Sequence, residues 1–168
     1  NREFLLKAEK SIDRMIEMVN DLDEISRLES NRMLLNRKKF DLNELTKEVI
    51  ESLEYKATLK DISIQITNPK ITNVIADPSK ISQVLTNLIV NSINYGKEGG
   101  RTKIKYFDLG ENILVEVNDN GRGIGEEHLS RLFERFYRVD KGRSRAEGGS
   151  GLGLAIVKHI MEAHDQTI

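Results

Sequence analysis

The stretch Asp119-Asn-Gly-Arg-Gly-Ile-Gly125 places a glycine at every second position, directly after an apolar, strand-like run that includes Val115 and Val117. Glycine has no Cβ, so such spacing marks backbone that bends sharply or approaches a ligand closely. A carboxylate at the end of a strand can accept a strong hydrogen bond from an exocyclic amine. A tight turn would need the same residues, so this stretch alone indicates either a turn or the wall of a pocket for a planar ligand.

A second glycine-rich stretch, Gly148-Gly-Ser-Gly-Leu-Gly-Leu154, runs into a helical pattern over 152–163. A helix start offers free N–H groups and the positive end of the helix dipole, which together favour anions. The stretch resembles two nucleotide motifs only in part. A polar, basic segment precedes it where a dinucleotide site needs a strand, and no Lys-Ser/Thr pair follows as in a P-loop.

Asn87 and Asn91 lie four residues apart on a helix that Asp77 and Pro78 are predicted to start and that runs through Tyr95. The rest of that helix is mostly apolar, so the two amides face a polar cavity or a ligand. Amide oxygens suit Mg²⁺, which usually keeps water and phosphate in its coordination shell. The alternative is a pair of helix-face asparagines that bond nearby backbone.

The N-terminal third is predicted to be one long amphipathic helix. Apolar residues recur there in steps of three and four, at Leu5, Ala8, Ile12, Met15, Val19, Leu22, Ile25 and Leu28. This is the seam spacing of a coiled coil or helical bundle. The helix would be about 45–50 Å long at 1.5 Å per residue, so part of its seam is expected to meet another chain rather than its own domain.

Between residues 41 and 163 the pattern predicts alternating helices and strands. Asp41 is a good N-cap for a helix through Leu53, and alternation indicates strands around 62–66, 71–76, 104–106 and 113–117, the last two forming a hairpin at Gly110. Further helices are expected at 126–135 and 152–163. The resulting fold class is an α/β two-layer sandwich, a mixed sheet with helices on one face, preceded by the long bundle helix.

Composition excludes several classes of function. The 26 Lys and Arg nearly balance the 27 Asp and Glu, so no global basic field attracts nucleic acid. The absence of Cys excludes disulfides, thiolate metal sites and a cysteine nucleophile. No run of residues approaches the roughly 18 apolar residues of a membrane span. Because the chain begins without Met in the middle of a helical pattern, we expect it to be part of a longer protein.

Taken in order, the motifs resemble those of one family. Asn87 to Asn91, Asp119 to Gly125, Phe133-Glu-Arg-Phe-Tyr137 and Gly149-Ser-Gly-Leu-Gly153 are similar to the N, G1, F and G2 boxes of the ATP-binding catalytic domain of sensor histidine kinases. That domain belongs to the gyrase, Hsp90, histidine kinase and MutL superfamily and has the Bergerat-type fold. The first helix resembles the second helix of the dimerisation and phosphotransfer domain. The resemblance implies a partial dimerisation domain over 1–38 and a catalytic domain over 39–168, without the family's final hairpin.

The resemblance also implies residue roles. Asn91 would be the Mg²⁺ ligand, Asn87 would lie toward the phosphates, Tyr95 would stack near adenine, Asp119 would bind the adenine amino group, and Arg138 would reach the γ-phosphate. Backbone at six glycines and one leucine would shape the base pocket and hold the phosphates: Gly121, Gly123, Gly125, Gly149, Gly151, Leu152 and Gly153. Residues 138–148 would form a lid over ATP.

One substitution bears on the reaction. Related ATPases carry a water-activating Glu four positions before the metal Asn, where this chain has Asn87. An amide cannot act as a base near neutral pH, so hydrolysis should be slow and transfer to a positioned nucleophile is favoured. The family's acceptor histidine lies upstream of the first helix here, and His128, His159 and His164 do not match it. The chain is therefore expected to bind Mg-ATP without phosphorylating itself.

The resemblance implies a homodimer through the first helix, a response regulator as phosphoryl acceptor, and a cytoplasmic location within a membrane-attached bacterial sensor. Two alternatives stay open at this point. One is an anti-sigma factor or adaptor of the same fold that acts by protein binding, although such proteins lack the long helix. The other is a purely structural dimerisation module, which would have no need of the residues from Asp119 to Gly153.

Overall fold

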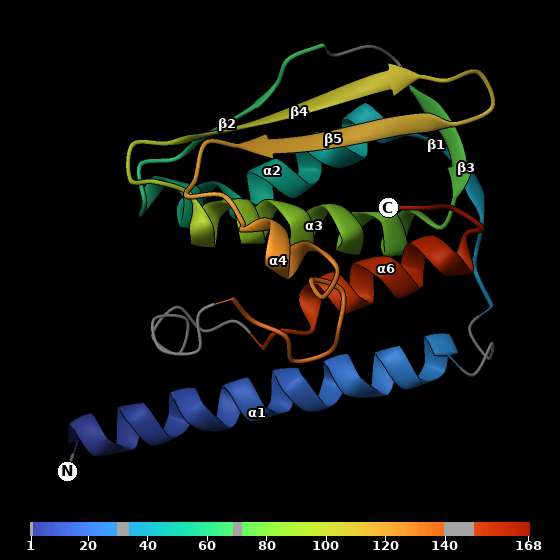
Figure 1. Ribbon diagram of the computed structural model, residues 1–168. Helices are drawn as coiled ribbons and strands as arrows, with labels where there is room; N and C mark the ends of the chain where they lie inside the picture. The colour runs from blue at the N-terminus through green and yellow to red at the C-terminus, as the bar shows by residue number, and fades with distance from the viewer. Residues whose placement is uncertain (1, 30–33, 69–71, 140–149) are drawn as a thin grey trace. The chain divides into compact units, whose positions relative to one another are not determined.

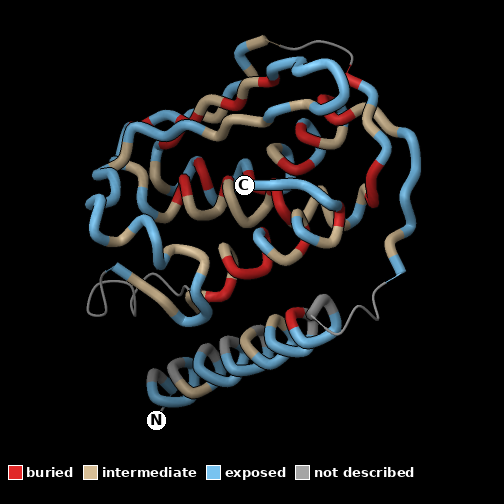
Figure 2. The backbone as a smooth tube through the Cα atoms, turned by 45° about the vertical axis from the view of Figure 1, so that its right-hand side comes forward, coloured by how far each residue is buried: buried red, intermediate tan, exposed pale blue. Residues whose placement is uncertain are grey.

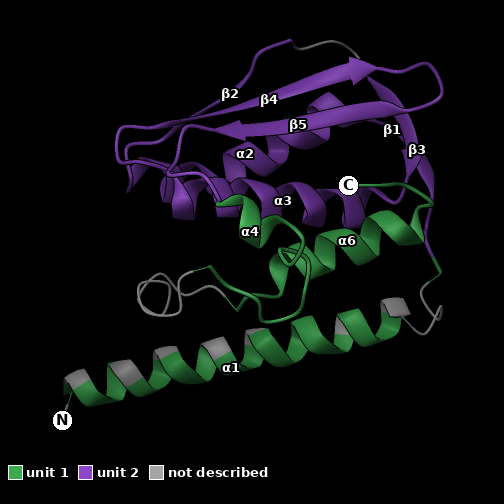
Figure 3. Ribbon diagram, viewed as in Figure 1, with its two compact units in different colours: residues 1–34, 125–168 green, residues 35–124 purple. Residues whose placement is uncertain are grey.

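The structure is a computed structural model that describes residues 2–29, 34–68, 72–139 and 150–168 (Figure 1). Its elements are α1 (Arg2–Glu29), β1 (Lys38–Asp41), α2 (Leu42–Thr58), β2 (Ser63–Ile66), β3 (Asn73–Ala76), α3 (Pro78–Tyr95), β4 (Arg101–Asp108), β5 (Ile113–Asp119), α4 (Glu126–Leu129) and α6 (Gly153–Ala163). They group into two compact units, residues 1–34 with 125–168, and residues 35–124 (Figure 3).

The unit of residues 35–124 holds a mixed three-stranded sheet in the order β2-β4-β5. Strand β2 runs parallel to β4, with Ser63 opposite Arg101, and β5 runs antiparallel to β4, with Asp119 opposite Thr102. Helices α2 and α3 cover one face of this sheet (Figure 1). The expected layering of helices on one face of a mixed sheet is therefore confirmed for this unit.

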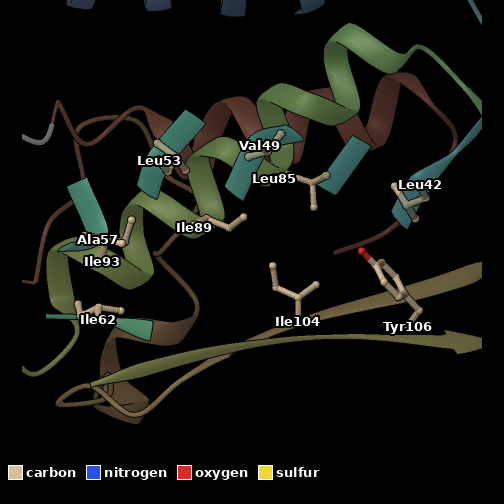
Figure 4. Close-up of a cluster of buried hydrophobic side chains, with 10 residues drawn as sticks. All are labelled: Leu42, Val49, Leu53, Ala57, Ile62, Leu85, Ile89, Ile93, Ile104 and Tyr106. Carbon is tan, nitrogen blue, oxygen red and sulfur yellow. The ribbon is translucent and has the colours of Figure 1, made fainter. Parts of the chain in front are cut away.

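The core of this unit lies between the sheet and its two helices (Figure 4). Side chains from α2, α3, β4 and the residue before β2 meet there, namely Leu42, Val49, Leu53, Ala57, Ile62, Leu85, Ile89, Ile93, Ile104 and Tyr106. Ile89 and Ile93 of α3 are fully buried. Since these residues alternate with Asn87 and Asn91 along α3, the packing of the apolar face fixes where the two amides point.

Both predicted helix caps are present. Asp41 Oδ1 accepts from the backbone N–H of Asn43 at 2.9 Å, and Asp77 Oδ1 accepts from those of Ser79 and Lys80 at 3.0 and 3.3 Å. Pro78 occupies the first turn of α3, where its missing N–H costs nothing. These caps set where α2 and α3 begin, and α3 carries the predicted metal and base residues.

Strand β1 was not expected from the sequence. Its four residues, Lys38 to Asp41, are paired antiparallel with β3, with Lys38 opposite Ala76. A run of four residues with two lysines carries no clear alternation, and its partner lies more than thirty residues away. The pairing is therefore a tertiary effect that overrides local propensity.

The unit of residues 1–34 and 125–168 contains α1, α4 and α6. Helix α1 packs against α6, and Ile25 of α1 is fully buried. The helix α1 spans Arg2–Glu29, and residues 34–37 are not helical. Figure 2 shows exposed residues along most of α1.

The predicted helix over 126–135 is wrong in length. Only Glu126–Leu129 is helical, and the chain then continues in tight turns, with Arg131 N–H bonded to the His128 carbonyl and Tyr137 N–H to the Glu134 carbonyl. Bonds that span three residues give a tighter turn than an α-helix. Phe136 then adopts a left-handed backbone with φ 61°, which no helix accommodates.

No helix in the described parts of the chain combines the length and the apolar character that crossing a membrane requires.

Candidate functional site

The C-terminal half of α3 presents the three residues predicted to meet the metal and the base. Asn87, Asn91 and Tyr95 follow one another at four-residue spacing and so share one side of the helix. Asn87 and Asn91 are half-buried, and no hydrogen bond among the described residues involves their side chains. The alternative in which these amides bond nearby backbone is therefore not what the structure shows.

Asp119 closes β5 and shapes the loop that follows. Its Oδ1 accepts from the backbone N–H of Gly121 at 2.7 Å, which leaves its second oxygen available to a ligand. A Cβ added at Gly121 would lie 2.6 Å from the carbonyl oxygen of Tyr95, so only glycine fits there. Gly123 has φ 73°, a left-handed conformation that glycine adopts at no steric cost.

These close approaches hold the end of β5 against the end of α3. Through Gly121, the Asp119 side chain and the Tyr95 backbone carbonyl come close to the same residue. Asp119 is exposed and Tyr95 is 36% exposed, so both can be reached by a ligand. A planar ring against Tyr95 with an amine directed at a carboxylate is the arrangement that would suit an adenine base.

Arg122 belongs to this neighbourhood and was given no role from the sequence. Its guanidinium carbon lies 5.5 Å from the centroid of the Tyr95 ring. The signal was its place between Gly121 and Gly123, but a lone exposed arginine in a glycine loop does not indicate its target before the fold is known.

The remaining predicted residues lie in the other unit. Gly125 precedes α4, and a Cβ there would meet the Glu127 carboxyl group at 2.6 Å, a flexible neighbour that could move. Arg138 is half-buried, and its Nε and Nη2 atoms are buried without a hydrogen-bond partner among the described residues. A guanidinium group with two buried, unsatisfied donors is suited to receive an anion.

The start of α6 is built by the predicted glycine loop. Gly151 has φ 75°, and its carbonyl oxygen accepts from the Phe136 N–H at 2.9 Å. Ser150 Oγ accepts from the N–H of Leu152 at 3.2 Å and donates to Asp21 Oδ2 of α1 at 3.3 Å. Leu152 is fully buried, so only its backbone could meet a ligand, and Gly153 begins the helix. Gly149 lies outside the described residues, as does most of the predicted lid.

A surface cavity of about 450 Å³ in this unit contains none of the predicted site residues. It is open to solvent and is lined by Ser130, Phe133, Glu134, Arg135, Lys158 and His159. Burial lowers the pKa of His159, Glu162 opposes that effect, and the positive charges of Arg135 and Lys158 lower the pKa further. Three of the lining residues, Phe133, Glu134 and Arg135, belong to the F box, but the lining includes neither a glycine loop nor an amide pair.

The three histidines are held by neighbouring groups. His128 Nδ1 shares a hydrogen bond of 2.7 Å with the Tyr137 hydroxyl, and His164 Nδ1 donates to the Ile160 carbonyl at 2.8 Å. His159 Nδ1 lies 3.5 Å from a Glu162 carboxylate oxygen. Among the described residues, no group of three or more His, Cys, Asp or Glu side chains could hold a metal ion. A metal here would therefore depend on amide oxygens and on the ligand itself.

Comparison with known proteins identifies the family. Residues 76–168, more than half of the chain, match the family described as histidine kinase-, DNA gyrase B-, and HSP90-like ATPase. The chain belongs to this ATPase family. Within the ATPase family, the relatives are sensor histidine kinases, so the expectation drawn from the N, G1, F and G2 boxes is confirmed at the level of family and domain type.

Two curated relatives align with nearly the whole chain. SenX3 of Mycobacterium tuberculosis, a sensor-like histidine kinase, is 40% identical over 99% of this chain and 41% of its own length. The sensor protein kinase WalK of Staphylococcus aureus is 37% identical over 99% of this chain and 40% of its own length. The chain thus spans about two fifths of the relatives that it matches.

Two solved structures of this ATPase family are also similar. Full-length ShkA in complex with AMPPNP superposes with a TM-score of 0.81 and 27% identity over 96% of this chain and 34% of that one. The histidine kinase ThkA, in complex with the response regulator TrrA, superposes with a TM-score of 0.74 and 28% identity over 98% of this chain and 45% of that one. In both comparisons the match includes α1 as well as the ATPase domain.

Proposed function

We propose that this chain is the ATP-binding part of a sensor histidine kinase, which positions Mg-ATP so that the γ-phosphoryl group passes to a histidine on a dimerisation helix of the parent protein. The observation that carries the proposal is the Asp119–Gly121–Tyr95 arrangement, in which Gly121 bonds the Asp119 carboxylate and approaches the Tyr95 backbone carbonyl so closely that only glycine fits. The similar protein ShkA was solved with AMPPNP, an ATP analogue.

The residues present fit such a ligand. The amides of Asn87 and Asn91 are uncommitted within the described chain, and Arg138 has two buried nitrogens without a partner. In our proposal Asp119 accepts from the base amine, Tyr95 stacks on the base, and Gly121, Gly123 and Gly125 keep the pocket open. Bound Mg-ATP supplies the phosphoryl group and part of the charge that balances it.

At the phosphates, Asn91 would hold the metal ion through its amide oxygen and Asn87 would lie toward the phosphates. Arg138 would donate to the γ-phosphate, and backbone N–H groups from Gly149 to Gly153 would bind phosphate oxygens. None of these residues is a base at neutral pH, so the chain orients and neutralises without activating water. Transfer to a histidine is therefore favoured over hydrolysis.

Nucleotide titration tests this assignment against a matched control. Asp119→Ala removes the base contact and the turn bond to Gly121. Asp108→Ala removes an equivalent turn bond, from Gly110 N–H to Asp108 Oδ1 at 2.8 Å, at the other end of the β4–β5 hairpin. We expect Asp119→Ala to weaken Mg-ATP binding about tenfold to a hundredfold and Asp108→Ala to leave it unchanged. Equal affinities for wild type and Asp119→Ala would show that the pocket lies elsewhere.

The acceptor histidine is proposed to lie outside this chain. His128, His159 and His164 each contact a neighbouring group within their own unit, which is a structural role. Incubation with γ-labelled ATP should therefore leave the chain without acid-labile phosphohistidine. A labelled histidine in this chain would contradict the proposal for the acceptor while leaving the ATP site intact.

The proposed partners are a second copy of this chain and a response regulator, and the proposed location is the cytoplasm. Helix α1 exposes a series of large apolar side chains that one chain leaves uncovered, namely Phe4, Leu5, Leu6, Ile12, Met15, Ile16 and Val19. Val19→Asp should lower the dimer fraction in sedimentation equilibrium. The similar kinase ThkA was solved with its response regulator TrrA, which supports a regulator as the second partner.

A further inference from the structure

The guanidinium group of Arg122 lies over the ring of Tyr95. A guanidinium group in direct contact with a ring lies about 3.5–4 Å from it, and two successive contacts with a planar base between them need about 7 Å. The observed 5.5 Å separates the Arg122 guanidinium carbon from the Tyr95 ring centroid. A centroid distance below about 6 Å is a direct cation–π contact, so a base could stack on this face of Tyr95 only after the guanidinium group moves away from the ring.

The backbone on both sides of Arg122 fixes where its side chain starts. Gly121 lies so close to the Tyr95 carbonyl that no Cβ fits, and its N–H is bonded to Asp119. Gly123 is left-handed at φ 73° with open space around it, so the loop on that side can adjust. Arg122 itself is exposed, so a movement of its side chain away from the ring would not disturb the core.

We propose that Arg122 is the second wall of the base site, so that the purine enters between the Tyr95 ring and the Arg122 guanidinium group. This inference rests on the proposed nucleotide site and adds a specificity-determining residue to it. A guanidinium group is planar, stacks on aromatic faces and is weakly hydrated, which an ammonium group is not. The base would thus be held on both faces while Asp119 reads its edge.

A purely structural role for Arg122 makes a different prediction. Helix α3 ends at Tyr95 and has no basic residue in its last turn, so a nearby cation could stabilise the negative end of its dipole. In that case Arg122→Ala would lower the midpoint of thermal unfolding, and Arg122→Lys would restore it. In our account the substitutions change nucleotide affinity and leave the unfolding midpoint essentially unchanged.

The experiment is a calorimetric titration of wild type, Arg122→Ala and Arg122→Lys with Mg-ADP and with Mg-ATP. We expect Arg122→Ala to weaken both nucleotides by the same factor, roughly 3- to 30-fold. Arg122→Lys keeps the positive charge but lacks the planar guanidinium group. It should therefore recover less than half of the affinity lost in Arg122→Ala, measured as the logarithm of the dissociation constant. The factor by which Arg122→Ala weakens nucleotide binding should be insensitive to ionic strength, since salt screens stacking less than it screens a charge contact to phosphate.

A double-mutant cycle with Tyr95→Ala locates the effect. If both side chains act on one base, the two losses should be strongly non-additive, because removal of either wall already abolishes the sandwich. Arg27→Ala serves as the control, since Arg27 forms an exposed ion pair with Asp23 on α1. Full recovery of affinity in Arg122→Lys, additive losses, or an unchanged affinity in Arg122→Ala would each overturn the inference. If wild type binds no nucleotide, the proposed function itself fails, which is a separate result.

Discussion

The backbone N–H of Phe136 donates to the carbonyl oxygen of Gly151 across 2.9 Å, and both residues have left-handed backbone, with φ of 61° and 75°. Phe136 belongs to the F box and Gly151 to the G2 box, so this bond joins the two motifs. A Cβ at Gly151 would lie 3.0 Å from the Phe136 backbone. The two motifs are therefore tied together by a contact that requires glycine.

Gly151→Ala should break this closure. The substitution adds a steric clash to an unfavourable φ, so we expect a loss of about 1–3 kcal/mol in the free energy of unfolding and a marked loss of Mg-ATP affinity. Gly110→Ala is the control, since Gly110 has φ 88° but nothing within 4 Å of the added Cβ. Equal losses of nucleotide affinity in the two variants would mean that the close approach to Phe136 is unimportant.

Arg138→Met should separate stability from binding. It replaces a guanidinium group, two of whose nitrogens are buried without a hydrogen-bond partner among the described residues, with an apolar side chain of similar length. The folded chain should keep its stability or gain about 1–3 kcal/mol, because buried donors without partners are costly. Mg-ATP should bind more weakly, and by a larger factor than Mg-ADP, if the side chain reaches the γ-phosphate. A large loss of stability would show that Arg138 holds the fold instead.

Asn91→Ala should remove the benefit of magnesium. We expect wild type to bind ADP more tightly with Mg²⁺ than with excess EDTA, and Asn91→Ala to bind equally weakly in both. Asn94→Ala is the control on the same helix. Asn94 forms a hydrogen bond through its backbone carbonyl, which accepts from Lys60 Nζ at 2.7 Å and which the substitution leaves in place. Magnesium dependence that survives in Asn91→Ala would assign the metal to other ligands.

Tyr106→Phe tests the core of the sheet unit and its dependence on pH. Burial raises the pKa of Tyr106, and the neighbouring Thr46 lowers it in part. The Thr46 hydroxyl proton is already engaged, because this group donates to the Leu42 carbonyl. The Tyr106 hydroxyl has no partner among the described residues, so its removal should be neutral or stabilising by about 1 kcal/mol at neutral pH.

The sign of the pH effect follows from the raised pKa. Above the unfolded-state value of about 10 the unfolded chain ionises this tyrosine first, so wild type loses stability as the pH rises through and beyond that value. Tyr106→Phe should lose less over the same range in denaturant titrations. Tyr55→Phe is the control, because Tyr55 is 77% exposed. Identical pH profiles for Tyr106→Phe and wild type would contradict the assignment.

The sequence predicted the elements whose local signals are strong. The caps Asp41 and Asp77, the start of α3 at Pro78 and the β4–β5 hairpin were all anticipated, because capping side chains and alternating apolar residues act within a few positions of one another. Strand β1 was missed, since it depends on a partner far along the chain. The helix beyond Leu129 was overextended, because the left-handed Phe136 gives no signal in residue type.

The residues of the candidate site also include some that the sequence indicated and one that it did not. The motif order indicated Asn91, Asp119 and Gly151, since amides, carboxylates and glycines at fixed spacing have few other uses. Arg122 was missed because its relation to Tyr95 exists only once β5 and α3 meet. After α6, Asp165 has φ 59°, a left-handed backbone that residue type alone did not reveal, although aspartate adopts it more readily than most residues.

The central claim is that the Asp119 carboxylate reads the amino group of adenine, and base discrimination tests it most directly. Adenine presents an amine where guanine presents a carbonyl oxygen, which a carboxylate repels. We therefore expect wild type to bind Mg-ADP at least about tenfold more tightly than Mg-GDP, and Asp119→Asn, whose amide can donate as well as accept, to lose most of that preference. Equal dissociation constants of wild type for the two nucleotides would contradict the account.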